Sequence, residues 1–189
     1  MISGALRSIL LLFPLAAFGQ SWDLQALMAA MAQVPSSQTR FVETRHLAML
    51  IQPIELKGSL RYERPNRLTK QIESPFNEQL SIDGEAVTLV NRKGEKRVIS
   101  LREQPALGAL VESVRATLAG DRAQLERYYK VAVSGPRENW TLRLAPREAK
   151  VRAYVDTITL AGAGARVESI EVLEAGGDRS VMRILHDAR

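Results

Sequence analysis

The apolar residues of this chain recur with two different periods. Between residues 21 and 34 they lie three or four positions apart, which predicts an amphipathic helix capped by Ser21 and ended at Pro35. The apolar stripe of this helix consists of Leu24, Leu27, Met28 and Met31. From Phe41 onward the period changes to two, so we expect β-strands in most of the remaining chain.

The clearest strand runs from Glu55 to Glu63. One face of this strand carries Leu56, Gly58, Leu60 and Tyr62, and the other face is charged or polar. Arg64-Pro65-Asn66 predicts a turn, and the strand after the turn carries Leu68, Lys70 and Ile72 on one face.

A tight hairpin is predicted at Asp83-Gly84, a dipeptide typical of two-residue turns. Leu80 and Ile82 precede this turn, and Val87 and Leu89 follow it at alternating positions. A charged turn over residues 91–96 then leads to a strand over residues 98–101.

Two further helices are predicted in the middle of the chain. Pro105 opens the first, which ends near Gly120, and Asp121 caps a shorter one that runs through Arg127. The apolar stripe of the longer helix consists of Leu107, Leu110, Val111, Val114 and Leu118. Five more strands are expected over residues 129–134, 140–145, 154–160, 166–173 and 180–186.

These elements predict a mainly β protein with some α-helix. Roughly ten antiparallel strands would form one curled sheet, which must bury its apolar face against itself and two or three short helices. We therefore expect an open, incomplete antiparallel β-barrel with an N-terminal helix and a second helix laid across it. The second helix is either part of a packed core or a lid over an apolar cavity, and its periodicity is compatible with both.

The N-terminus has the pattern of a secretory signal. One positive charge in residues 1–7 precedes an uncharged apolar run over residues 8–18, and Ala17-Phe18-Gly19 carries small residues where a signal peptidase cleaves. The run is too short to span a bilayer, so an uncleaved anchor or a buried helix is the weaker interpretation. We expect a signal peptide over residues 1–19, a single domain over residues 20–189, and a location in the periplasm of a Gram-negative bacterium.

Composition excludes several classes of chemistry. The chain has no cysteine, which excludes disulfides, thiolate metal sites and a lipid-modified N-terminal cysteine. His46 and His186 stand alone without metal-ligand spacing, and no nucleotide-binding or hydrolase motif occurs. The net charge is +5, but basic and acidic residues alternate without a basic block. We expect no catalytic residues, no metal, no cofactor and no nucleic-acid partner, and a hydrolase is a distant alternative.

Three features together resemble the LolA-like family of periplasmic outer-membrane lipoprotein carriers. The first is Gly58-Ser59-Leu60-Arg61-Tyr62-Glu63-Arg64-Pro65-Asn66, which is similar to that family's Gly-x-Leu-x-x-x-Arg-Pro-Asn segment. The second is Ser74-Pro75 followed by Leu80-Ser81-Ile82-Asp83-Gly84. The third is the order of elements, ending in late strands with Leu142-x-Leu144-x-Pro146.

The resemblance implies a half-closed barrel with a helical lid over an apolar cavity, and a monomer that carries acyl chains from the inner towards the outer membrane. Its partners would be an inner-membrane donor transporter and an outer-membrane acceptor. The family has aromatic residues in strands where this chain has aliphatic ones, so the cargo is either a lipoprotein or another envelope lipid, such as a polyene-type lipid. A sensor of the same fold, which binds a mislocalised lipid or a regulatory peptide, is the alternative function.

Alternation along the strands and the facing helical stripe together predict which side chains line the cavity. They are Leu60, Tyr62, Leu68, Ile72, Leu80, Ile82, Val87, Leu89, Leu107, Leu110 and Val111. Two cations, Arg64 and Lys70, are expected near one rim of this pocket. Leaving both unpaired there would cost several kcal/mol, so a partner must compensate. Each either extends its charge into water or has a role: the resemblance implies that Arg64 bonds the carbonyls of the lid helix, and Lys70 would meet an anionic headgroup.

Overall fold

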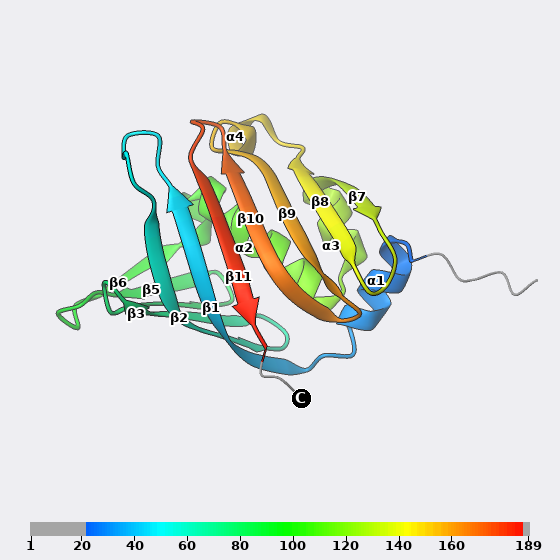
Figure 1. Cartoon of the computed structure of the whole chain (residues 1–189), viewed down its shortest axis with the longest axis horizontal. Coiled ribbons are helices and arrows are strands. Elements are labelled where there is room, and N and C mark those ends of the chain that lie inside the picture. The colour runs from blue at the N-terminus through cyan, green and yellow to red at the C-terminus, as the bar shows by residue number, and fades with distance from the viewer. Residues whose placement is uncertain (1–21, 187–189) are drawn as a thin grey trace, which may run out of the picture.

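The computed structural model describes residues 22–186 as one antiparallel sheet of eleven strands with helices packed on its inner face (Figure 1). The order across the sheet is β6-β5-β4-β3-β2-β1-β11-β10-β9-β8-β7. The strands are β1 Ser36–His46, β2 Ile54–Glu63, β3 Arg67–Ser74, β4 Glu78–Asp83, β5 Ala86–Val90, β6 Lys96–Ser100, β7 Tyr129–Ser134, β8 Trp140–Pro146, β9 Val155–Ala163, β10 Arg166–Glu174 and β11 Arg179–Leu185.

The expected curled, open sheet is confirmed, with eleven strands where about ten were predicted. Its centre is β1, which pairs with β2 on one side and with the last strand, β11, on the other. The sheet does not close, because β6 and β7 are its two edges and do not pair with each other. The pairing of β1 with β11 brings the two ends of the domain together along the middle of the sheet.

Four α-helices and one short 3₁₀ helix complete the fold. They are α1 Leu24–Met31, η1 Leu101–Glu103, α2 Pro105–Ala119, α3 Arg122–Tyr128 and α4 Ala149–Arg152. The predicted stop of α2 at Gly120 is confirmed, since this residue adopts the left-handed conformation with φ 70°. Asp121 caps α3 as expected, its side chain accepting a hydrogen bond from the Gln124 amide at 3.0 Å.

Two details of the helices differ from the prediction. The N-cap of α1 is Asp23 and not Ser21, because the Asp23 side chain accepts a hydrogen bond from the Ala26 amide at 2.9 Å. The four-residue helix α4 was not predicted, since one turn is too short to produce a periodic pattern. The predicted signal peptide, residues 1–19, lies outside the described residues. Among residues 22–186, no helix combines the length and the apolar character needed to cross a membrane.

The sheet bends at Gly58, where β2 and β3 come close together. A Cβ on Gly58 would lie 1.8 Å from the Gln71 carbonyl oxygen and 3.1 Å from the ring of Phe41, so no larger residue fits. The register between β2 and β3 shifts at this point, between Lys57 and Gly58. Such an irregularity increases the local bend of a sheet. It divides the sheet into a half with β3–β6 and a half with β7–β11.

The buried apolar residues form two clusters of unequal size. The larger cluster packs α1, α2 and α3 against β7–β10, and its fully buried side chains include Leu27, Trp140, Leu142 and Leu160. The smaller cluster lies beneath the other half and contains only Ile82, Val87, Leu101 and Val111. Leu68, Leu80 and Leu89 pack against this cluster but stay half-buried, so the inner face of β3, β4 and β5 is only partly filled by the protein's own core.

Candidate functional site

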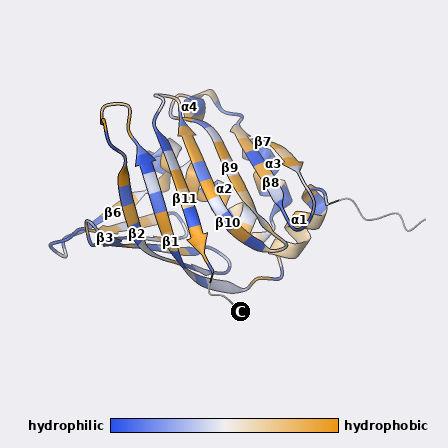
Figure 2. Cartoon of the chain, viewed as in Figure 1, coloured by the Kyte–Doolittle hydropathy of each residue, from blue (hydrophilic) through white to orange (hydrophobic). Residues whose placement is uncertain are grey.

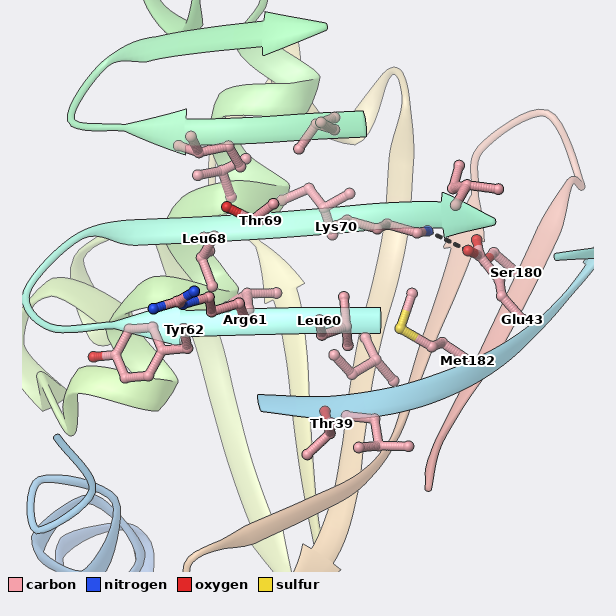
Figure 3. A pocket seen from close by; sticks show the side chains of 18 of the residues that line it. Thr39, Glu43, Leu60, Arg61, Tyr62, Leu68, Thr69, Lys70, Ser180 and Met182 are labelled. Atoms are coloured by element: carbon pink, nitrogen blue, oxygen red, sulfur yellow. Dashed lines mark hydrogen bonds and ion pairs between the residues drawn. The ribbon is translucent and has the colours of Figure 1, made fainter. Parts of the chain in front are cut away.

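A cavity of about 1250 Å³ lies between α2 and the inner face of the sheet. It exceeds the range of about 300–1,000 Å³ that is usual for small-molecule sites. The walls come from β1–β6 and β9–β11, and one face of α2 covers them. Figure 3 shows Leu60, Leu68 and Met182 pointing into this space.

Ten of the eleven predicted apolar positions line the cavity. From the strands these are Leu60, Tyr62, Leu68, Ile72, Leu80, Ile82 and Leu89, and from α2 they are Leu107, Leu110 and Val111. Val87 is the exception, because it is completely buried in the smaller cluster beneath the wall. The alternation along β2–β5 thus placed the side chains on the correct face.

The opposite wall of the cavity was not predicted. It consists of aliphatic and Met side chains from the last two strands, namely Ile170, Val172, Met182 and Ile184. These residues reach the site because β11 pairs with β1, a contact between segments about 140 positions apart. Alternation in β10 and β11 could have shown which residues face inward, but not which strand lies beside them.

A polar cluster of Glu43, Arg45, Lys70 and Ser180 interrupts the apolar wall. Glu43 lies on β1 with its side chain only 3% exposed, and its carboxylate accepts hydrogen bonds from Arg45 Nε at 2.8 Å and from Ser180 Oγ at 2.6 Å. The Lys70 ammonium donates to the second carboxylate oxygen, as the dashed line in Figure 3 shows. Lys70 Nζ also lies 5.0 Å from the centre of the Phe41 ring, in cation–π range.

Burial affects the pKa values of both Glu43 and Lys70. Burial alone would raise the pKa of Glu43, but the charge and hydrogen bond of Lys70, followed by Ser180 and Arg45, lower it below its ordinary value of 4.5. Burial lowers the pKa of Lys70, and Glu43 opposes this without reversing it. The formal charges of Glu43, Lys70 and Arg45 add up to one excess positive charge.

Glu43 is the buried charged residue of the site that the sequence analysis missed. Alternation places Phe41, Glu43 and Arg45 on one face of β1, and the same alternation places Phe41 in the core. A carboxylate on a core-facing position was therefore a visible signal. Lys70 was predicted to need a compensating partner, and that partner is Glu43.

Arg64 is directed at the helices and not at the pocket rim. Its guanidinium donates to the carbonyl of Ala32, just after α1, and to the carbonyl of Ala119, the last residue of α2, at 3.2 Å. A single side chain thus joins the end of β2 to two helix ends, whose last carbonyls otherwise lack partners. The expectation that Arg64 and Lys70 share one pocket rim is wrong, since they contact different elements.

Two further contacts hold α2 over the cavity. Arg115 donates to the carbonyl of Gly84 in the β4–β5 turn at 3.0 Å, and Tyr129 donates to the carbonyl of Ala109 at 2.5 Å. By contrast, the Tyr62 hydroxyl is buried and has no hydrogen-bond partner within the described residues. A buried hydroxyl without a partner costs about 1–3 kcal/mol. The contacts of Arg115 and Tyr129 therefore hold α2 over the cavity, while the buried Tyr62 hydroxyl opposes part of their stabilisation.

The site suits an amphiphilic molecule. Its apolar walls can take extended hydrocarbon chains, and the polar cluster can bond one polar group through the remaining N–H donors of Lys70 and Arg45. No group of three or more His, Asp or Glu side chains placed to hold a metal ion occurs in residues 22–186.

The chain is similar to several solved structures. One is a LolA superfamily protein from Nitrosomonas europaea, with 13% identity and a TM-score of 0.46 over 88% of this chain and 95% of that chain. Another is a putative outer membrane lipoprotein-sorting protein domain from Vibrio parahaemolyticus, with 10% identity and a TM-score of 0.50 over 87% of this chain and 90% of that chain. No curated protein sequence matches the chain.

The sequence itself matches a known family over most of its length. The family profile described as outer membrane lipoprotein carrier protein LolA-like covers residues 16–187. This range includes every strand and helix of the structure. The chain therefore belongs to the family of LolA-like outer membrane lipoprotein carrier proteins.

Proposed function

We propose that this protein is a non-enzymatic periplasmic carrier that holds the acyl chains of a lipid or lipoprotein in its cavity and moves them from the inner towards the outer membrane. The observation that carries the proposal is the unfilled apolar space between α2 and the sheet. Burial of acyl chains contributes about 0.8 kcal/mol per methylene, so even partial insertion of one long chain is sufficient for transport in water. An inner-membrane donor and an outer-membrane acceptor complete the route.

In this proposal the aliphatic positions from Leu60 to Leu89 and the facing residues of α2 form the chain-binding surface, and the polar cluster receives the headgroup. The cluster has one excess positive charge, so it favours an anionic group such as a carboxylate or a phosphate. Lys70 would bond this group while Glu43 stays satisfied by Arg45 and Ser180.

Native mass spectrometry of the protein purified from its own periplasm tests this function. We expect a copurifying molecule with one or more acyl chains, whose mass distinguishes a lipoprotein from another envelope lipid. Protein that is consistently free of any lipid, and that takes up none from added membrane extract, would contradict the carrier function.

Arg64 acts in this proposal as a latch that holds α2 over the empty cavity. We call this arrangement the covered state. Removing its bonds to Ala32 and Ala119 would favour the uncovered state, because only the covered state contains them. Arg64→Leu should then bind cargo about tenfold more tightly and release it more slowly, with the fold intact. Amide exchange in residues 105–119 should become faster in the empty protein.

Arg67→Leu is the matched control for Arg64→Leu, because Arg67 is equally close to the turn but pairs with Asp83 and not with a helix. It should leave both cargo affinity and the exchange of α2 unchanged. Equal behaviour of the two variants would remove the latch from the proposal.

A further inference from the structure

The loop between β1 and β2, residues 47–53, exposes three consecutive apolar side chains. Met49, Leu50 and Ile51 are 87%, 45% and 103% exposed, and this segment is the projecting, orange-tipped loop between β1 and β2 in Figure 2. We call it the apolar loop. Single exposed apolar residues are ordinary, but three in succession on a projecting tip are typical of an interaction site.

The apolar loop is held in place by hydrogen bonds at its base. The Ala48 amide donates to the Asp178 carboxylate at 2.7 Å, and the Leu50 amide donates to the Leu47 carbonyl at 2.9 Å. Asp178 belongs to the turn between β10 and β11. The loop therefore presents its three apolar side chains from a fastened base, and these side chains contribute little to the core.

The apolar loop adjoins the cavity. Leu47 at its base and Asp178, which holds it, both line the cavity. The β5–β6 turn also contributes lining residues, among them Asn91, Lys96 and Arg97. Antiparallel pairing brings the β1–β2, β3–β4, β5–β6 and β10–β11 turns to the same ends of their strands. The apolar loop and the β5–β6 turn thus stand at one mouth of the cavity.

The β5–β6 turn is basic. Residues 91–97, which we call the basic turn, contain Arg92, Lys93, Lys96 and Arg97 against one acidic residue, Glu95. All four cations are exposed, and none forms an ion pair with any residue in the described range 22–186. Figure 2 shows this turn as the blue tip beside β6.

We propose that the mouth of the cavity docks on an anionic phospholipid bilayer. The apolar loop inserts its side chains among the acyl chains, while the basic turn faces the phosphate groups. The surface of such a bilayer has negatively charged headgroups on the outside and hydrocarbon beneath them. The unpaired cations match the headgroups, and the aliphatic tip matches the hydrocarbon. Docking would place the cavity mouth against the membrane. A role for this docking in transport rests on the proposed function, whereas the docking itself does not.

Vesicle cosedimentation of the purified exported protein tests this inference. The vesicles contain phosphatidylethanolamine with one quarter phosphatidylglycerol, and a parallel set contains phosphatidylcholine alone. We expect binding to the anionic vesicles that weakens with salt, and at least tenfold weaker binding by Met49→Ser/Ile51→Ser. Lys93→Gln should lose about fivefold, since one cation near an anionic surface contributes roughly that factor.

The control variants remove the same two kinds of side chain, apolar and cationic, from another part of the surface. Leu185→Ser removes an exposed apolar side chain at the far end of β11, and Arg183→Gln removes an exposed cation on the same strand. Both should bind anionic vesicles like the unchanged protein. Fatty-acid uptake by Met49→Ser/Ile51→Ser should be unaffected, which separates docking from the carrier function.

Three results would overturn the inference. The first is equal vesicle binding by the loop variant and Leu185→Ser. The second is equal binding to anionic and phosphatidylcholine vesicles. The third is a dimer in solution that Met49→Ser/Ile51→Ser dissociates, because the apolar loop would then be a contact between two copies of the chain.

Discussion

Strands β8 and β3 have the same alternating pattern, but their inner faces have different surroundings. On β8 the inward residues Trp140 and Leu142 are completely buried against helices α1 and α3. On β3 the inward residues Leu68 and Ile72 remain half-buried, and the space above them is the cavity. Alternation alone therefore shows which face of a strand is apolar, while the helices decide whether that face becomes core or binding site.

The division also explains how a partly hollow protein remains folded. The half with β7–β11, together with the helices packed on it, contains most of the completely buried large side chains and can supply most of the stability. The half with β3–β6 has only a four-residue cluster of its own. Such an arrangement leaves the hollow half free to exchange a ligand without loss of the core.

The largest effect is expected at the buried ion pair of Glu43 and Lys70. Glu43→Leu leaves Lys70 without its carboxylate in the cavity wall and should lower the free energy of unfolding by about 4 kcal/mol. Adding Lys70→Met removes the remaining charge and should restore stability to within about 1 kcal/mol. Urea denaturation measures both values.

The control for this pair is Glu73→Leu. It breaks the exposed ion pair with Arg40, whose side chains are 41% and 57% exposed, and should cost less than about 1 kcal/mol. If Glu43→Leu cost no more than Glu73→Leu, the polar cluster would be solvated and could not hold a headgroup selectively.

A matched pair of leucines compares the two halves directly. Leu142→Ala in the packed half should cost about 3 kcal/mol, whereas Leu80→Ala in the cavity wall should cost about 1 kcal/mol. Leu80→Ala should also weaken fatty-acid binding, and Leu142→Ala should not. Equal losses of stability would mean that the cavity wall is packed as tightly as the core.

Acid should act on the hollow half first. The lowered pKa of Glu43 means that its contribution to stability is fully present above pH 4.5 and is lost as the pH falls through the lowered value. Glu43→Gln lacks this acid-sensitive contribution. The difference in the free energy of unfolding between this variant and the unchanged protein should therefore become smaller below pH 4.5. Urea denaturation at a series of pH values measures the difference, and a constant difference would contradict the ionised pair.

The smallest effect concerns the Tyr62 hydroxyl. Tyr62→Phe removes a buried group that has no partner among residues 22–186 and should raise the free energy of unfolding by about 1 kcal/mol. It should also slow amide exchange in α2, because the unpaired hydroxyl, which favours movement of α2 away from the sheet, is gone. A loss of stability would show instead that the hydroxyl has a bonded partner, such as an ordered water.

Most of the fold follows from local patterns in the sequence. Alternation located β2–β5 and their inward residues, and helical spacing together with Gly120 and Asp121 located α2 and α3. The pairing of β1 with β11 has no local signal, because strands of either half would satisfy the same hydrophobic pattern. The wall formed by Met182 and Ile184 therefore could not be predicted.

The charged part of the site was predictable only in part. Lys70 between Leu68 and Ile72 was recognised as a cation in an apolar place, and the need for a partner followed from the cost of burying it. The identity of that partner depends on β1 and β3 lying on either side of β2, which a single strand does not reveal. Arg64 does not share a rim with Lys70, but it donates to the Ala119 carbonyl at the end of α2, the kind of contact that the resemblance implied.

The central claim is that the space beneath α2 receives an acyl chain, and titration with a fluorescent fatty acid tests it most directly. We expect saturable binding that unlabelled palmitate displaces. Leu80→Trp, which narrows the cavity, should weaken binding, while Ser81→Trp on the opposite face of the same strand should not. Binding by Leu80→Trp equal to that of the unchanged protein, or no saturable binding by the unchanged protein, would contradict the account.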